Sequence, residues 1–259
     1  MEDNDPDMNN KVPLSVAIIT KNEQVRLPDC LRSVSFVDDI VIVDSESTDD
    51  TVNIAKQFGC RVFVEDWKGD GPQKNSAIAK TKNEWVLVLD ADERLTCEAK
   101  EEIMAIISSE TNADAYSFPR KSIFHGKWIK HGGWWPDRVV RLFKKSKGRY
   151  HSITHGQWIT TGKQGLAKGS LEHYSFVDYS DMIKRLNNYS SFRANEMFNE
   201  KAASSYFKAA SHGLFMFFNS FVLKRGFLEG LDGLVIALTT AGVSFFKYAK
   251  LVENHKYNK

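Results

Sequence analysis

Two aspartates, Asp90 and Asp92, stand at the end of an apolar run in the segment WVLVLDADERL. A buried strand that ends in Asp-x-Asp presents two carboxylates from one tight turn, and such hard oxygen ligands hold Mg²⁺ or Mn²⁺. A cation held there can bridge a diphosphate and stabilise the charge of a leaving group. Because an Asp-x-Asp pair is also a common polar turn, its context in the chain has to decide between these two interpretations.

The first half of the chain alternates short apolar runs with amphipathic stretches. The apolar runs cover residues 15–20, 39–44, 61–64 and 85–90, and the amphipathic stretches cover 25–34, 50–58, 72–79 and 98–108. Continuous β-branched runs indicate strands that are buried on both faces, and their alternation with helices is typical of a parallel sheet. The sequence therefore predicts an α/β fold, Rossmann-like, with a mostly parallel sheet and flanking helices.

Polar side chains follow three of these predicted strands. They are Thr20, Asn22 and Glu23 after the first strand, Asp44 at the end of the second, and Asp90 and Asp92 at the end of the fourth. Open α/β sheets bind their ligands outside the carboxyl ends of the strands, so we expect these side chains at one edge. The chain contains neither GxGxxG nor GxxxxGK[ST], which argues against a Rossmann dehydrogenase and a P-loop NTPase.

Composition and charge are typical of a globular protein. Of the 259 residues, 42% are hydrophobic and 26% are charged, and the formal net charge is +2. The three cysteines lack CxxC or histidine spacing, which argues against a disulfide framework or a zinc site and favours a reducing compartment. Residues 1–10 are acidic, whereas a secretory signal starts with basic residues, so we expect a cytoplasmic protein.

Three segments follow one another along the chain: AIITKNE, IVIVDSESTDDT and GPQKNSAIAKTKNEWVLVLDADERL. In this order they resemble the nucleotide-sugar domain of family 2 glycosyltransferases, which have the GT-A fold. The resemblance covers about residues 14–110 and implies a UDP-sugar donor with Mg²⁺ or Mn²⁺ as cofactor. It implies that Thr20, Asn22 and Glu23 contact the nucleotide, Asp44 the uracil or ribose, Lys74 the far end of the donor, Asp90 the ribose or sugar, and Asp92 the metal.

A second group of segments, GGWWPDRVVRLFKK, LEHYSF and GFLEGLDGLVIAL, is similar to the lipopolysaccharide inner-core β-glucosyltransferases. This resemblance implies an inverting, metal-dependent hexosyltransferase that moves glucose from UDP-glucose onto a lipid-linked saccharide such as lipopolysaccharide core. Two alternatives stay open. One is a family 2 transferase that uses another UDP-sugar on a capsule, teichoic or protein-linked acceptor, and the other is a nucleotide-sugar-binding scaffold that lacks a general base.

The question of the general base arises at Thr154-His155-Gly156, where that subfamily is expected to have Val-His-Glu. An inverting transfer needs a group that takes the proton of the attacking hydroxyl, usually Asp or Glu. Asp137 is the acid of the basic, Trp-rich stretch, and His155, with an ordinary pKa near ~6.5, can accept a proton at neutral pH. Asp137, His155 and an unrecognised carboxylate are therefore the candidate catalytic bases.

Residues 120–150 contain ten Lys or Arg and a single acid, and four tryptophans lie within or near this stretch. Aromatic faces suit sugar rings and basic groups suit phosphates, although we expect at least two of the four tryptophans in the core. The expected acceptor-binding residues are Trp134, Trp135, Arg138 and Arg141. No RNA-binding or DNA-binding motif accompanies the charge, so a nucleic acid is not an expected partner.

The C-terminal region, residues 178–259, is predicted to consist of amphipathic helices. Its most apolar segment, LDGLVIALTTAGVSFF, is shorter than the ~20 residues that a bilayer-spanning helix needs. We expect interfacial helices whose lysines and arginines meet an anionic membrane surface, which would place the protein on the inner face of the cell membrane. An oligomer interface, or a helical layer packed on the sheet, is the alternative.

The expected domain organisation follows from these patterns. A disordered tail covers 1–12, a GT-A catalytic domain covers 13–177 with a donor half at 13–110 and an acceptor half at 111–177, and the helical membrane-associating region covers 178–259.

Overall fold

A computed structural model describes residues 11–109, 112–151 and 156–257 of the chain. It contains two compact units. Unit 1 comprises Met1–Arg120 and Asp137–His173, and unit 2 comprises Lys121–Pro136 and Tyr174–Lys259. The segment 121–136, expected in the acceptor half of the catalytic domain, thus packs with the C-terminal helices. The domain boundaries proposed from the sequence stay predictions.

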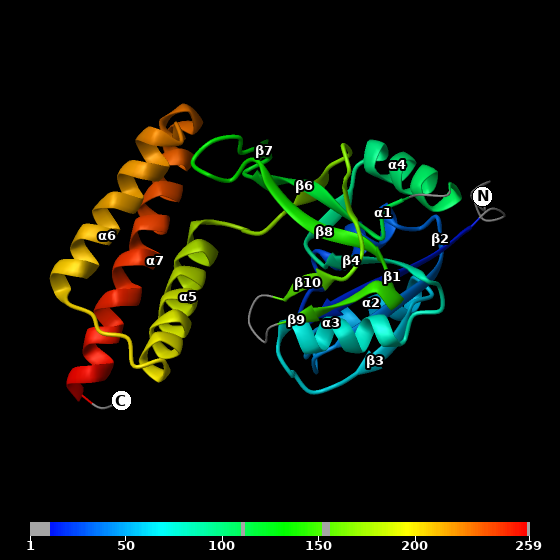
Figure 1. The fold of residues 1–259 in the computed structure, drawn as a ribbon, viewed down its shortest axis with the longest axis horizontal. Coiled ribbons are helices and arrows are strands. Elements are labelled where there is room, and N and C mark those ends of the chain that lie inside the picture. The colour runs from blue at the N-terminus through cyan, green and yellow to red at the C-terminus, as the bar shows by residue number, and fades with distance from the viewer. Residues whose placement is uncertain (1–10, 110–111, 152–155, 258–259) are drawn as a thin grey trace. The chain divides into compact units, whose positions relative to one another are not determined.

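Unit 1 begins with parallel strands that alternate with helices (Figure 1). The strands are β1 (Val12–Thr20), β2 (Val37–Asp44), β3 (Arg61–Val64) and β4 (Trp85–Asp90), and the helices are α1 (Leu27–Ser33), α2 (Thr51–Gln57) and α3 (Asp70–Ala79). They pair in the order β3-β2-β1-β4, and each of these pairs is parallel. The predicted α/β fold with a mostly parallel sheet in this half is confirmed.

The sheet continues beyond β4 with two long strands, β6 and β8, and several short ones that the sequence pattern did not predict. They are β8 (Asp137–Lys144), β6 (Ala115–Phe124), β12 (Leu171–His173), β5 (Glu93–Leu95), β11 (Gln164–Leu166) and β7 (Lys127–Trp128), while β9 (Gly148–His151) pairs with β10 (Gln157–Thr160) separately. Helix α4 (Cys97–Ser108) follows β5, and a 3₁₀ turn, η2 (Lys145–Lys147), precedes β9. Several of these strands have only three or four residues, which is too few for an alternation of apolar and polar residues to be recognised in the sequence.

The core of unit 1 lies on both faces of the sheet, as the continuous apolar strands require. On β1, Val16 and Ile18 face a cluster that includes residues of α1 and α4, whereas Ala17 faces a second cluster under α3. Neighbouring residues separate in this way because successive side chains of a strand point to opposite faces. Trp158 belongs to the second cluster and stacks on Phe143, with ring centroids 3.5 Å apart.

The register of the parallel strands brings their carboxyl ends together. Thr20 pairs with Asp44 across β1 and β2, and Ile19 pairs with Asp90 across β1 and β4. The polar residues that follow these strands therefore gather at one edge of the sheet, where ligands bind in open α/β folds.

Unit 2 contains helices α5 (Tyr179–Asn199), α6 (Tyr206–Phe218) and α7 (Gly230–Tyr257), with a π-helical turn η3 (Asn219–Leu223) and a 3₁₀ turn η4 (Gly226–Glu229) between α6 and α7. Helix α7 packs against both α5 and α6 (Figure 1). A small core of Phe124, Ile129, Met182 and Ile236 joins the helices to the segment 121–136, and Trp134 packs against it. With Trp158, this gives two core-packed tryptophans, in agreement with the expectation from the sequence.

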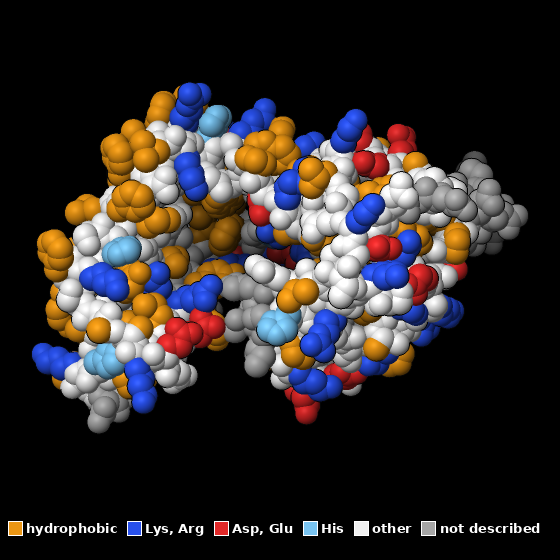
Figure 2. Space-filling view, viewed as in Figure 1, with side chains coloured by type: hydrophobic (Ala, Val, Ile, Leu, Met, Phe, Trp, Pro, Cys, Tyr) orange, Lys and Arg blue, Asp and Glu red, His pale blue; other side chains and the backbone are white. Residues whose placement is uncertain are grey.

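Large apolar side chains remain exposed on α6 and α7 (Figure 2). They include Phe207, Leu214, Phe215 and Phe218 on α6, and Leu231, Leu238, Phe245 and Phe246 on α7. By length and composition alone, the segment Gly226–Tyr257 is also apolar enough to cross a membrane, with a mean hydropathy of 1.4 and 28% of the window buried. The sequence argument against a span counted only the central apolar run, whereas the helix continues well past it.

A buried polar cluster ties the strands together at the other end of the sheet, where β1 and β2 begin. The carboxylate of Asp39 accepts hydrogen bonds from Ser15 Oγ at 2.6 Å and from the backbone N–H of Lys82 at 2.8 Å, and it pairs with Arg61 at 2.8 Å. Burial opposes ionisation of Asp39, but these hydrogen bonds and the charge of Arg61 outweigh it and lower the pKa of the carboxyl group.

Replacing Asp39 by asparagine should lower the free energy of unfolding by about 2 kcal/mol at pH 7, because charge-assisted hydrogen bonds are lost. A carboxyl with a lowered pKa in the folded state stabilises above its unfolded pKa of ~3.9. The difference between the wild type and Asp39→Asn should therefore shrink as pH falls below about 4. Urea denaturation between pH 3 and pH 8 measures it, with the exposed neighbour Asp38→Asn as control. An equal effect of both substitutions would contradict the assignment.

Candidate functional site

Asp44 organises the loops that follow β1 and β2. Its buried carboxylate accepts hydrogen bonds from Thr20 Oγ1 at 2.7 Å, from the backbone N–H of Ser47 at 2.7 Å and from Ser47 Oγ at 2.5 Å. Three donors fill most of the acceptor capacity of a carboxylate. In this structure Asp44 therefore holds the shape of the two loops, and its contact with uracil or ribose stays a prediction.

Asn22 and Glu23 connect the same two loops. Asn22, with φ at 56°, accepts a hydrogen bond from the backbone N–H of Thr48 at 2.8 Å, and its own N–H donates to Ser47 Oγ at 2.8 Å. The backbone N–H of Glu23 donates to Thr51 Oγ1 at 2.8 Å. The predicted nucleotide-binding residues of the first two strand ends thus form one hydrogen-bonded ledge at the edge of the sheet.

Asp90, at the end of β4, lies between two buried cations. Its carboxylate pairs with Lys74 Nζ at 3.0 Å, from helix α3, and with Arg141 Nη2, from β8. Lys74 also pairs with Asp70 at 3.1 Å. Lys74 and Arg141 are only 5% and 4% exposed, and their positive charges are compensated by carboxylates, as burial requires. The structure brings the predicted Lys74 and Asp90 into direct contact.

A second carboxylate, Glu93, completes this cluster, and the sequence did not single it out. It is fully buried, pairs with Arg141 at 2.7 Å and with Arg120 at 3.2 Å, and accepts a hydrogen bond from the backbone N–H of Asp90 at 3.1 Å. The sequence carried a signal for Glu93, because it directly follows the Asp-x-Asp pair, and an acid in a short segment between apolar residues suggests a buried partner of opposite charge. Arg120 in turn pairs with Asp137, so a chain of alternating charges links Asp90 to Asp137.

The charges in this cluster shift one another's ionisation. Burial raises the pKa of Asp90, but Arg141 and Lys74 outweigh it and hold the pKa far below its usual range. For Lys74, burial favours the neutral amine, but the charge of Asp90 more than compensates and raises the pKa. Burial also opposes the charge of Arg141, whose pKa is nevertheless raised by Asp90 and Glu93. These groups are therefore charged at neutral pH.

Asp92 points toward a different partner, His173 at the end of β12, with 3.6 Å between Oδ2 and Nε2. Both side chains are largely buried, with 15% and 16% exposed. Burial opposes ionisation of Asp92, but the hydrogen bond and charge of His173 outweigh it and lower the pKa. His173 is a site residue that spacing could not find, because the pairing of β12 with β5 brings it to Asp92.

The donor set around Asp92 fits a divalent cation that is held partly by substrate. Within the described ranges, no three His, Cys, Asp or Glu side chains are grouped so that they could hold a metal ion by themselves. Mg²⁺ needs only one or two protein carboxylates, because water and substrate phosphates complete its octahedron. Asp92, with His173 beside it, can supply that share, whereas Asp90 is already paired with two cations.

The expected acceptor residues are distributed over different environments. Arg141 belongs to the buried charge cluster. Arg138 donates to the backbone carbonyls of Ser117 at 2.7 Å and Ala167 at 2.5 Å, so its guanidinium group braces unit 1. In unit 2, Trp134 stacks on Phe176, and Trp135 meets Trp128 edge to face. His155 lies outside the described residues. Whether any of these side chains touches an acceptor stays a prediction.

Comparison with known proteins identifies the family. The model of the family described as glycosyl transferase family 2 matches residues 15–168. The chain belongs to glycosyl transferase family 2. The matched residues include the strand ends that carry Thr20, Asp44 and Asp90. The hydrogen-bonded ledge and the charge cluster therefore lie within the part of the chain that matches the family.

Individual relatives agree with this membership over most of the chain. An uncharacterized glycosyltransferase of Rickettsia typhi is 34% identical over 254 residues, which cover 93% of this chain and 87% of the relative. The lipopolysaccharide core biosynthesis glycosyltransferase LpsC of Rhizobium meliloti is 28% identical over 95% of this chain and 94% of its own. A solved structure, S. aureus TarS 1–349, shares the fold with a TM-score of 0.50 at 15% identity, covering 96% of this chain and 92% of that one.

Arg141→Met should lower the free energy of unfolding by about 3–5 kcal/mol, because it leaves Asp90 and Glu93 as neighbouring buried carboxylates without their shared cation. Adding Glu93→Gln should recover about 0.5–3 kcal/mol of this loss, since it removes one of the two carboxylates that share Arg141. Urea denaturation of the single and double variants measures this coupling.

The matched control is Arg138→Met, on the same strand. Its guanidinium group donates to two backbone carbonyls and to Ser117 Oγ at 3.4 Å, and its loss should cost about 1 kcal/mol. If the effects of Arg141→Met and Glu93→Gln simply add, the two side chains do not act as one charge cluster.

Proposed function

We propose that this family 2 glycosyltransferase is a metal-dependent, inverting hexosyltransferase that moves glucose from UDP-glucose onto a lipid-linked saccharide such as lipopolysaccharide core. The observation that carries the proposal is that the two aspartates of the Asp-x-Asp pair have different partners. Asp90 is fixed between Lys74 and Arg141, and Asp92 is turned toward His173. The carboxylate of Asp90 is thus held by two cations, while that of Asp92 lies beside His173, a second side chain that could bind a metal ion.

The donor side is supported by the arrangement of the strand ends. The ledge formed by Thr20, Asn22 and Asp44 fixes the two loops beside which a nucleoside would bind, and Lys74 and Arg141 supply buried positive charge beside Asp90. A diphosphate placed between them would meet cations in a site of low dielectric, where electrostatic attraction is strong. Asp92 and His173 would hold Mg²⁺ or Mn²⁺, which when bound supplies positive charge to the departing UDP.

Asp137 is the proposed base of the acceptor hydroxyl. Its carboxylate accepts a hydrogen bond from Arg120 Nε at 2.9 Å, and its side chain is 41% exposed, so it can be reached from solvent. Arg120 also pairs with Glu93, and this link ties Asp137 to the cluster that holds Asp90. Asp137 would take the proton as the hydroxyl attacks the anomeric carbon, and Arg120 would keep its carboxylate oriented.

A lipid-linked acceptor is supported by unit 2 and by one relative. LpsC of Rhizobium meliloti is named for lipopolysaccharide core biosynthesis. The exposed apolar side chains of α6 and α7 lie close in sequence to basic residues, among them Lys208 and Lys247. A helical surface that combines apolar and basic groups binds anionic lipid surfaces. We therefore place the enzyme on the inner face of the cell membrane, next to its acceptor.

Asp92→Asn should reduce transfer by about a hundredfold or more at saturating donor, because a charge aimed at the leaving group is lost. It should also weaken Mn²⁺ binding, and a metal titration of transferase activity measures both effects. Asp66→Asn, an exposed aspartate of unit 1, is the control and should leave both unchanged. Wild-type turnover of Asp92→Asn at saturating metal and donor would show that the metal role is wrong.

The donor and the stereochemistry are tested with the unaltered enzyme. We expect transfer from UDP-glucose to exceed transfer from UDP-GlcNAc, UDP-GalNAc and UDP-galactose on a lipid-linked saccharide. We also expect proton NMR of the product to show a β linkage formed from the α-linked donor. A preference for another sugar would overturn the glucosyl assignment, and an α product would overturn inversion.

Asp137→Asn should lower kcat by roughly 10²–10⁴-fold, the usual contribution of a general base, while the Kd of the UDP-sugar stays unchanged. The control is Asp114→Asn, another carboxylate of unit 1 that pairs with a cation, Lys144, at 3.1 Å. Single-turnover kinetics measure the rate of transfer, and calorimetric titration measures the Kd of the UDP-sugar. If Asp137→Asn transfers at the wild-type rate, the base lies elsewhere and His155 becomes the candidate.

A further inference from the structure

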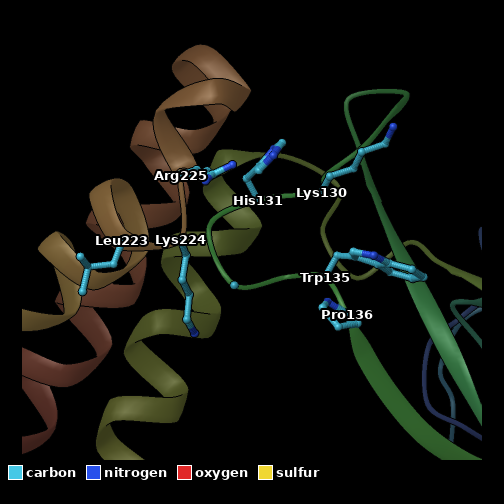
Figure 3. Close-up of a pocket in the computed structure, with 8 residues that line it drawn as sticks. Lys130, His131, Trp135, Pro136, Leu223, Lys224 and Arg225 are labelled. Carbon is cyan, nitrogen blue, oxygen red and sulfur yellow. The ribbon is translucent and has the colours of Figure 1, made fainter.

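Unit 2 contains a pocket that the proposed reaction does not use. It has a volume of about 420 Å³, within the ~300–1,000 Å³ typical of small-molecule sites. Its walls come from two segments, residues 130–136 of the loop after β7 and Leu223–Arg225 of the turn between α6 and α7. Figure 3 shows the two segments facing each other, with Trp135 on the loop side and Lys224 and Arg225 on the helical side.

The two walls are locked together by the backbone. Gly132 N–H donates to the carbonyl of Lys224 at 2.9 Å, and Ser220 Oγ donates to the carbonyl of Gly132 at 2.9 Å. On the other side, Glu229 accepts hydrogen bonds from the backbone N–H groups of Lys130 at 2.9 Å and of His131 at 3.0 Å. These contacts fix the shape of the pocket, so it is largely formed before any ligand arrives.

Two backbone features make room for basic side chains at this point. At Gly133, with φ at +95°, a Cβ atom would come within 2.9 Å of Lys224 Nζ, so glycine there lets the amine lie against the loop. Arg225 adopts φ at 54°, a left-handed conformation that non-glycine residues seldom take. Strain of this kind persists where the surrounding structure enforces it, and it often marks a ligand site.

The pocket carries unbalanced positive charge. Lys130, Lys224 and Arg225 all line it, and none of them forms an ion pair with a carboxylate in the described part of the chain. Glu229 is not part of the pocket lining, and its carboxylate is occupied by the backbone N–H groups of Lys130 and His131 and by His131 Nδ1 at 2.6 Å. Cations gathered around a hollow without a counter-charge attract an anion, and lysine and arginine are the usual phosphate binders.

We propose that this pocket binds a phosphorylated sugar of the acceptor, with the phosphate on Lys224 and Arg225 and the sugar ring against Trp135. The ring of Trp135 is held edge to face by Trp128, with centroids 4.9 Å apart, and a fixed aromatic face suits the apolar side of a sugar. The inference rests on the proposed function, which makes the acceptor a lipid-linked saccharide, and adds that this saccharide bears a phosphomonoester.

Calorimetric titration of the full chain with glucose 6-phosphate, glucose and inorganic phosphate tests the inference without any donor. Glucose 6-phosphate should bind more tightly than either of the other two probes. The double variant K224Q/R225Q should raise its Kd at least about tenfold, because two phosphate contacts are lost. Trp135→Leu should abolish the preference for the sugar phosphate over inorganic phosphate, because only the ring contact is lost.

The matched control is K184Q/K256Q, which removes the same charge from exposed lysines of unit 2 and should leave the Kd unchanged. Equal weakening by both double variants would reduce the effect to general electrostatics and overturn the inference. So would loss of binding to phosphatidylglycerol vesicles in K224Q/R225Q without loss of sugar phosphate binding, because it would assign the pocket to a lipid headgroup.

Donor hydrolysis by the unaltered chain in the same preparation keeps the two proposals separate. If the chain hydrolyses UDP-glucose but does not bind glucose 6-phosphate, the phosphate pocket is wrong and the transferase proposal stands. If it binds glucose 6-phosphate but neither hydrolyses nor transfers any UDP-sugar, the proposed reaction is wrong.

Discussion

Burying charged side chains at the end of β4 costs free energy, and this cost constrains how the neighbouring elements of unit 1 are arranged. Asp90 and Glu93 can stay ionised there because Lys74, Arg141 and Arg120 reach them from α3, β8 and β6. Each of these side chains comes from a different element, so the cluster joins the parallel half of the sheet to its antiparallel extension. A charge cluster of this kind tolerates little displacement, because an unpaired buried charge costs several kcal/mol.

The cluster also separates the roles of the two aspartates in the motif. Asp90 is neutralised by protein cations, so it can shape the site without a metal. Asp92 pairs instead with His173. If the proposed reaction takes place here, a site held in this way needs little reorganisation when the donor reacts.

Unit 2 follows a different physical principle. Although α7 packs against α5 and α6, helices α6 and α7 leave several phenylalanines and leucines in contact with solvent. Exposed apolar surface of this extent marks an interaction site. The pocket beside Lys224 and Arg225 adds specific polar groups to this unit. Unit 2 thus combines an exposed apolar surface with a pocket lined by basic and aromatic groups.

The sequence by itself determined the α/β class, the parallel strands and their order along the chain, the strand ends that carry Thr20, Asp44 and Asp90, and the family. These features are local, because apolar runs and polar turns are written in consecutive residues. Tertiary structure decided the partners: Glu93 with Arg141, Asp92 with His173, and the loop at Gly133 with Lys224. No periodicity reveals such contacts, because they depend on the pairing of short strands and on helix packing, which bring together residues far apart in the chain.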